Sequence, residues 1–345
     1  MKPDGANSIT EGYQKRNKKY FFTSLILLMI TLCLASFMMI YGNTIYSPAI
    51  IFQVLMGEEI KGAGFTIASL RFPRMLSAIL CGFAFGLAGN TFQMLLGNPL
   101  ASPDIIGVTS GASVAAVFGI LVLGLSQNEV SLLAVASGII ISSLIYFLSR
   151  KNGFSNGRLI LTGIGIQAFL NAVTSWLLLR ASEYDVASAL RWLNGSLNGI
   201  KTDQIPRLFI AVILSGGIIL LLNRHLMTLQ LGETYSITLG VHIKTIRLLL
   251  ILCSIVLIAF AVSVTGPIAS VAFLSGPIAA RLVGSGRSNL IVSALMGSVL
   301  VLTGDLAGQF ALPSRYPAGV ITGILGAPYL LFLLLHTNRK GENIS

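Results

Sequence analysis

Long apolar runs separated by short polar breaks dominate the chain. A helix needs about 20 mainly apolar residues to cross a hydrocarbon core of about 30 Å. Windows of that length predict about ten spans, at residues 21–41, 73–96, 105–125, 130–149, 159–179, 207–223, 245–265, 267–283, 290–311 and 317–336. The sequence therefore predicts an all-α integral membrane protein.

Composition supports this class, because 54% of the 345 residues are hydrophobic and only 10% are charged, far from ordinary soluble usage. The apolar windows leave no room for a separate soluble domain. We expect one transmembrane domain over residues 21–336, flanked by tails at 1–20 and 337–345.

Basic residues predict the orientation, because Lys and Arg are retained on the cytoplasmic side. Of the 23 Lys and Arg residues, 15 fall on the side of the N-terminal tail and 8 on the other. Both tails are therefore expected in the cytoplasm. The basic stretch at residues 15–19 leads into an apolar run too long for a signal peptide, so this run is expected to remain as the first span. The net charge of +11 then anchors the protein to membrane lipid and does not indicate nucleic-acid binding.

The segment from residue 71 to 111 carries RFPR at 71–74 and the polar break GNPLASPD at 97–104. A break with proline survives at membrane depth only where protein or a water-filled path satisfies the freed backbone groups. The segment therefore indicates a conduit. Glycines spread through the spans, as in GFAFGLAG at 82–89, are expected to serve mostly close helix packing and, for a minority, the path.

Few polar groups inside the spans suggest chemistry. Asp305 would cost about 3 kcal/mol at a bilayer centre unless paired or near water, which leaves open a functional role and a structural hydrogen bond to a neighbouring helix end. Asp104, after Pro103, is expected to cap the third span. Single cysteines and histidines without HExxH or paired spacing predict neither a metal site nor a catalytic set; they are Cys33, Cys81, Cys253, His225, His242 and His336.

Residues 227–247, between the sixth and seventh spans, have mixed polarity. Apolar residues interleave with polar ones there, at Leu231, Tyr235, Ile237 and Leu239. This pattern predicts one or two short helices at the inner face, available to a soluble partner. A membrane-surface helix is the alternative, although the segment lacks the basic polar face typical of such helices.

Several stretches together resemble FecCD-type permeases, the membrane subunits of ABC importers for iron-siderophores, haem and cobalamin. The resemblance runs from about residue 20 to 336, and its most specific stretches are residues 71–113, 158–178, WLNGSL at 192–197, LGETYSITLGV at 231–241, 266–284 and 316–334. It implies the type II ABC importer permease architecture in a bacterial cytoplasmic membrane. It also implies a second permease subunit, two ATP-binding cassette subunits and an extracytoplasmic substrate-binding protein.

The resemblance implies three groups of site residues. Docking of the binding protein is assigned to Arg71 and Arg74, and to Arg315, which lies a few residues after Gln309. The gate and pathway are assigned to Asn98, Pro99, Leu100 and Asn156. Coupling to the ATPase is assigned to a segment at about 227–244, with Gly232, Glu233, Leu239 and Gly240 as contacts. Pro277 stands where many relatives carry histidine, and Gln309 where some carry arginine, so whether Arg315 compensates is open.

The sequence has no GxxxxGK[ST] loop, because GVHIKT at 240–245 lacks the glycine before lysine. ATP is therefore expected on the partner subunits, and this chain is expected to be no enzyme and to bind no cofactor. The expected cargo is a ferric siderophore, with haem or cobalamin as the alternative. A different class, the ion-coupled secondary transporter, would normally show paired intramembrane acids. The sequence leaves open whether the second permease is another copy or a related chain.

Overall fold

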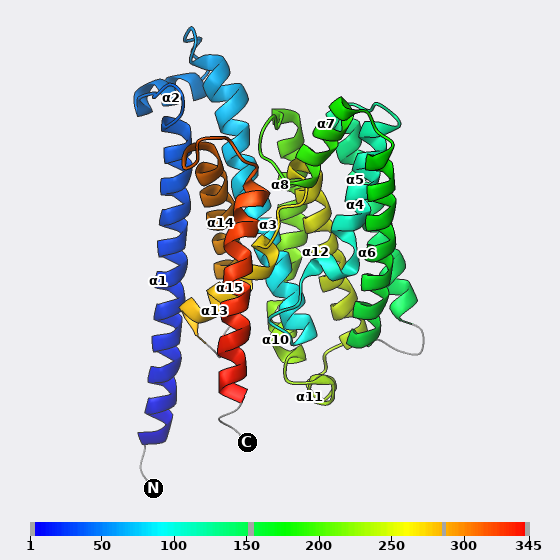
Figure 1. Cartoon of the computed structure of the whole chain (residues 1–345). Helices are drawn as coiled ribbons and strands as arrows, with labels where there is room; N and C mark the ends of the chain where they lie inside the picture. The colour runs from blue at the N-terminus through cyan, green and yellow to red at the C-terminus, as the bar shows by residue number, and fades with distance from the viewer. Residues whose placement is uncertain (1–3, 151–154, 285–287, 342–345) are drawn as a thin grey trace.

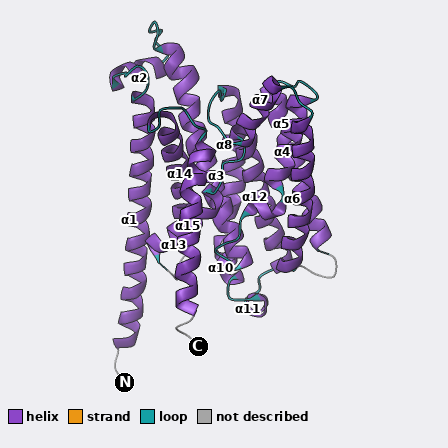
Figure 2. Ribbon diagram, viewed as in Figure 1, coloured by secondary structure: helices purple, strands orange, loops and turns teal. Residues whose placement is uncertain are grey.

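The computed structural model describes residues 4–150, 155–284 and 288–341. Within these ranges the regular structure is all helical, and the long helices run roughly parallel in one bundle (Figures 1 and 2). Seven stretches of the described residues are long and apolar enough to cross a membrane. They lie in α1 (Asp4–Ile40), η1 with α3 (Phe65–Arg71 and Phe72–Leu96), α5 (Gln127–Ser149), α6 (Asn156–Leu179), the continuous run η3, α8, η4 and α9 (Thr202–Gln204, Ile205–Ala211, Val212–Gly216 and Gly217–Leu221), α12 (Ile243–Thr265) and α14 (Leu290–Phe310).

The remaining elements define two ends of the bundle. Both α2 (Pro48–Leu55) and α7 (Glu183–Leu193) lie at one end, called here the α2 end (Figure 1). At the opposite end, called the α11 end, lie α10 (Asn223–Leu229), α11 (Glu233–Thr238), the start of α1 and the end of α15 (Ala318–Gly341). The predicted N-terminal tail is thus helical from Asp4 onward, and residues 1–3 and 342–345 of the two predicted tails lie outside the described residues.

Two predicted spans are shorter than expected. The third is the 14-residue α4 (Val108–Leu121), preceded by the short 3-10 helix η2 (Pro103–Ile106), and the eighth is the 13-residue α13 (Val271–Val283). Positive φ angles of 73° at Gly107 and 69° at Ser270 interrupt the helical backbone immediately before each one. A 14-residue helix is about 21 Å long, short of the hydrocarbon thickness. The number of membrane crossings therefore stays a prediction.

Glycines on one face of α3 let this helix pack directly against α13 and α14. A Cβ atom at Gly82 or Gly86 would overlap the backbone of α14, and one at Gly89 would overlap the Ala272 carbonyl of α13. Ser293 Oγ also donates a hydrogen bond of 2.8 Å to the Gly86 carbonyl. Small residues allow such close approach of helices in membranes. These glycines serve packing, and they hold α3 in the buried centre of the bundle.

A proline inside α13 is compensated from α3. Pro277 has no N–H, so the Phe273 carbonyl four residues earlier lacks its helical donor. Gln93 Nε2 donates to that carbonyl at 2.9 Å, and Asn289 Nδ2 donates to the neighbouring Gly276 carbonyl at 3.2 Å. The backbone groups around the proline are thereby satisfied at membrane depth, as the bilayer requires.

Burial differs sharply among the long helices. In α12, as in α3, 72% of the apolar window is buried inside the bundle, whereas only 22% of that of α6 is buried. Large apolar side chains are exposed along α6, including Leu161, Phe169 and Leu179. Such an apolar surface suits contact with lipid or with another chain.

Candidate functional site

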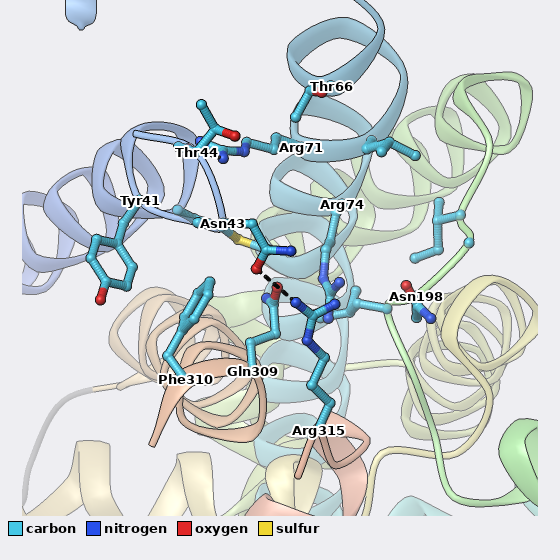
Figure 3. A pocket seen from close by; sticks show the side chains of 16 residues that line it. Tyr41, Asn43, Thr44, Thr66, Arg71, Arg74, Asn198, Gln309, Phe310 and Arg315 are labelled. Atoms are coloured by element: carbon cyan, nitrogen blue, oxygen red, sulfur yellow. Dashed lines mark hydrogen bonds between the residues drawn. The ribbon is translucent and has the colours of Figure 1, made fainter. Parts of the chain in front are cut away.

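A cavity of about 330 Å³ opens at the α2 end of the bundle. Its walls come from four segments far apart in the sequence: the end of α1, the η1–α3 region, the loop after α7 and the end of α14 with the loop beyond it. They bring the three predicted docking arginines, Arg71, Arg74 and Arg315, into one cavity (Figure 3). Three guanidinium groups around one opening favour an anionic partner.

Arg71 anchors the end of α1. Its Nη1 donates to the Met39 and Ile40 carbonyls at 2.7 and 2.9 Å, and its Nη2 donates to the Thr44 carbonyl at 2.5 Å. The guanidinium also lies 5.0 Å from the centre of the Tyr46 ring. The last carbonyls of a helix have no intrahelical donors, so Arg71 satisfies groups that α1 leaves open. Its charge remains in the cavity wall.

Arg74 pairs with the acidic residue inside the ninth predicted span. Its Nε and Nη2 donate to the two carboxylate oxygens of Asp305 at 2.9 and 2.7 Å. Gln309 Nε2, one helical turn along α14, donates to Asp305 Oδ2 at 2.7 Å. The Asp305 side chain is only 1% exposed and that of Arg74 is 20% exposed. The structure thus gives Asp305 a structural partner, which is one of the two roles that the sequence left open.

Arg315 reaches the same cavity from the loop before α15. Its Nη2 donates to Asn43 Oδ1 at 2.8 Å, a contact drawn as a dashed line in Figure 3. Gln309 lines the cavity beside it, and Asn198 contributes from the loop after α7 (Figure 3). Gln309 and Arg315 therefore line the same cavity, and the guanidinium in this part of it comes from Arg315 and not from position 309.

The predicted gate residues follow the other end of α3. Gly97 ends this helix in the left-handed conformation, with φ 62°. Asn98 then forms a tight turn, because its Oδ1 accepts a hydrogen bond of 2.8 Å from the Leu100 N–H. Asn98 and Pro99 are exposed and Leu100 is half-buried. Because α3 has 25 residues, this turn lies about 37 Å along the helix from Arg71.

Asn156 lies against the same turn. It begins α6, and its Nδ2 is 3.4 Å from the Leu96 carbonyl, at the last residue of α3. The structure thus brings the two predicted gate segments into contact. Part of the loop ahead of α6, residues 151–154, lies outside the described residues.

The expected capping role of Asp104 is wrong. Its carboxylate accepts hydrogen bonds from the hydroxyls of Ser102 and Thr109, and Gly107 precedes α4 without a side-chain cap. Ser102 is the capping residue, because its Oγ accepts from the Asp104 N–H at the start of η2. A hydroxyl on the following helix satisfies the carboxylate in place of backbone N–H groups.

The segment 227–244 forms a folded unit at the α11 end. Gly232 and Gly240 flank α11 with φ angles of 102° and 77°, which favour glycine. Buried Ser236 donates to the carbonyl of Gly232, which precedes α11, at 2.8 Å, and to the Thr228 carbonyl of α10, at 3.0 Å. These bonds hold α11 against α10 as a compact elbow.

The outer surface of this elbow is apolar. Leu231, Tyr235, Ile237 and Leu239 are each more than 60% exposed. Glu233 links the elbow to α12 through an ion pair of 2.8 Å with Arg247. A cavity of about 720 Å³ lies beside it, lined in part by Ile237, His242 and Lys244. An exposed apolar surface on a braced short helix is typical of a protein–protein contact.

Sequence reasoning missed the side chains that support these sites. Gln93 and Asn43 look like ordinary polar residues in an apolar helix and a loop, and only their distant partners give them roles. It also left out α2 and α7, which lie in stretches too polar or too short to span. For α7 a local signal exists, because Ser182 caps the helix and Asp185 follows three residues later.

Comparison with known proteins identifies the family. The model of the FecCD transport family matches residues 26–336. The chain belongs to this family. Among its relatives, the ferric enterobactin transport system permease protein FepG of Escherichia coli is 37% identical over 294 residues, covering 84% of this chain and 88% of the relative. The iron(3+)-hydroxamate import system permease protein FhuG of Bacillus subtilis is 32% identical over 302 residues, covering 85% and 90%.

A solved structure agrees with the bundle. The structure of a metal-chelate type ABC transporter in an inward-facing conformation superposes with a TM-score of 0.81 at 26% identity, covering 91% of this chain and 98% of that one. The expected architecture of an ABC importer permease is thus confirmed. The chain is a transport subunit with multiple apolar helices, as expected for a multi-pass protein of a bacterial inner membrane.

Proposed function

We propose that this FecCD permease is one membrane-spanning half of an ATP-driven importer that moves a ferric siderophore into the cytoplasm. The family match over residues 26–336 carries the proposal. Relatives named for ferric enterobactin, achromobactin and iron(3+)-hydroxamate transport support the cargo class. ATP hydrolysis takes place on two separate cassette subunits, since this chain has no phosphate-binding loop.

An extracytoplasmic binding protein docks at the α2 end. The arginine cavity receives carboxylates of this partner, with Arg74 and Arg315 as direct contacts and Arg71 holding the rim together. Electrostatic complementarity of this kind raises the encounter rate and fixes orientation more than it adds affinity. Affinity for the chelate then belongs to the binding protein, which explains why the described part of the spans carries so few charged residues.

The ATPase subunits press on the α11 end. The apolar patch of Leu231, Tyr235, Ile237 and Leu239 contacts a cassette subunit, and Gly232 and Gly240 set the shape of the elbow. The ion pair between Glu233 and Arg247 passes the displacement to α12. With this end inside, both termini are cytoplasmic, in agreement with the distribution of basic residues.

The turn after α3 gates the inner side of the path. Leu100 supplies an apolar side chain that closes the path by excluding water. Asn156 joins the start of α6 to this turn, so a movement of α6 relative to α3 changes the constriction. Asn98 and Pro99 fix the turn that presents Leu100. A second permease, either another copy or a related chain, completes the path along the exposed face of α6.

Two other functions are less well supported. Transport of haem or cobalamin uses the same architecture, and relatives named for siderophores favour the ferric chelate. An ion-coupled secondary transporter needs an intramembrane acid free to bind an ion, whereas the Asp305 carboxylate already accepts hydrogen bonds from Arg74 and Gln309.

Removal of positive charge from the cavity tests the docking surface. A variant with Arg74→Gln and Arg315→Glu should lose docking of the cognate binding protein, because the glutamine keeps a hydrogen-bond donor toward buried Asp305 while both positive charges leave the cavity. Arg207→Glu is the matched control, because Arg207 is exposed on α8 and does not line this cavity. Unchanged docking in the double variant would remove the cavity from the functional account.

A further inference from the structure

The ion pair between Arg74 and Asp305 joins a partly exposed guanidinium to a buried carboxylate. Arg74 lies near the start of α3 and lines the cavity, whereas Asp305 is buried in α14. Two roughly parallel N–H···O bonds hold the planar guanidinium to the planar carboxylate. A bidentate pair of this kind fixes orientation as well as charge. The pair therefore sets the direction in which the rest of the guanidinium points.

Asp305 itself is held rigidly. On either side of it, Gly304 packs against Thr322 of α15, and a Cβ atom at Gly308 would overlap the Tyr316 carbonyl. The Tyr316 N–H donates to the Gly308 carbonyl at 2.9 Å. This turn of α14 is thus clamped to the loop that carries Arg315, so one rigid element supports two of the cavity's arginines.

The pairing leaves part of Arg74 available. It uses Nε and Nη2, and among the described residues no hydrogen bond is made by Nη1. The side chain is 20% exposed and faces the cavity. Gln309 Nε2 donates to Asp305 Oδ2, the oxygen that also accepts from Arg74 Nε, and so holds the carboxylate from a second direction. The free edge of the guanidinium is presented in one orientation.

We infer that Asp305 is a positioning residue for docking, which holds Arg74 with its free edge toward a carboxylate of the binding protein and does not touch that protein itself. This inference rests on the proposed docking function of the cavity. It gives the buried acid a role at the outer face of the importer, and it distinguishes Asp305 from an acid that carries an ion or a proton across the membrane.

Removal of the Asp305 carboxylate should strengthen docking if only its charge matters, and weaken docking if it positions Arg74. Asp305→Asn deletes a negative charge behind the cavity, so electrostatics alone would speed association and strengthen docking. Loss of position acts on the lifetime of the complex, because interface geometry is expressed mostly in dissociation. We expect dissociation to accelerate roughly tenfold while association stays the same or rises. A general loss of folding would produce no such split.

The experiment uses the full permease with its partner subunits in lipid nanodiscs and the purified cognate binding protein. Association and dissociation rates are measured by surface plasmon resonance for the wild type, Asp305→Asn, Arg74→Ala and the double variant. If Asp305 acts through Arg74, Asp305→Asn should not accelerate dissociation further once Arg74 is alanine, which a double-mutant cycle on the dissociation rates detects. Independent, additive effects would overturn the inference.

Further variants keep the test decisive. Arg74→Lys retains the charge and loses the fork geometry, so it should reproduce the faster dissociation. Gln309→Ala removes one donor to the carboxylate and should give a smaller effect in the same direction. If Asp305→Asn does not yield folded protein, these two carry the test, and normal dissociation in both would refute the inference. Normal docking by Arg74→Ala would instead reject the docking function itself.

Discussion

Gln93 on α3 supplies the hydrogen bond that Pro277 cannot make within α13. Its Nε2 lies 2.9 Å from the Phe273 carbonyl oxygen, the acceptor that an N–H at position 277 would have reached. The bond couples the helix that precedes the polar break to a helix with a proline in its middle. In a bilayer, where no water can donate to the Phe273 carbonyl, the Gln93 side chain replaces the missing backbone N–H.

Gln93→Leu should destabilise the permease by about 1–3 kcal/mol, because a buried carbonyl loses its donor. Thermal unfolding in detergent measures the change. Pro277→Ala restores a backbone N–H, so Gln93→Leu should be milder in that background. An equal loss with and without the proline would show that Gln93 does not act as its substitute.

Arg71→Ala should lower thermal stability as well, by about 1–3 kcal/mol, because the carbonyls of Met39, Ile40 and Thr44 lose a charged donor. The exposed Arg207→Ala serves as the control and should leave the melting temperature unchanged. Equal melting temperatures for the two variants would mean that Arg71 does not anchor the end of α1.

Gly240→Ala should uncouple ATP hydrolysis from transport, because a φ of 77° strains any residue with a Cβ and the elbow must change shape. The ratio of chelate imported to ATP hydrolysed should fall, and hydrolysis itself should continue. Gly124→Ala is a matched control at the α2 end, with φ 60° and, like Gly240, open space around the added Cβ. A normal ratio for Gly240→Ala would exclude the elbow from coupling.

Leu100→Ala should open a leak through the resting permease, since a smaller side chain no longer excludes water from the constriction. Efflux of a small trapped dye from proteoliposomes, without ATP, measures the leak. Leu144→Ala, at an exposed position of α5, should not raise it. If the two variants leak equally, Leu100 is not part of the gate.

The sequence predicted the span-forming helices well, because the length of an apolar run limits what can cross a bilayer. It predicted the third and eighth spans longer than α4 and α13 are, because residue type alone does not reveal the left-handed backbone at Gly107 and Ser270. Close packing explains Gly82, Gly86 and Gly89 of α3, and the repeat of small residues in the sequence predicted it. The prediction that Asp104 caps a helix was wrong because Ser102 accepts the N–H at the start of η2, and the Thr109 hydroxyl donates to the Asp104 carboxylate.

The candidate site was predictable in part. Family resemblance named Arg71, Arg74 and Arg315 separately, and the fold gathers them around one cavity. The pairing of Arg74 with Asp305 was out of reach, because 231 residues separate the two and neither carries a local signal of the other. For the same reason the sequence did not predict that Arg71 anchors the end of α1.

The most direct measurement of the central claim is uptake of an ⁵⁵Fe-labelled siderophore into proteoliposomes that hold the purified permease, with and without its cassette subunits. The account predicts uptake that requires ATP, the cassette subunits and the binding protein, and that a protonophore leaves unchanged. Uptake by the permease alone, abolished by a protonophore and indifferent to ATP, would contradict it.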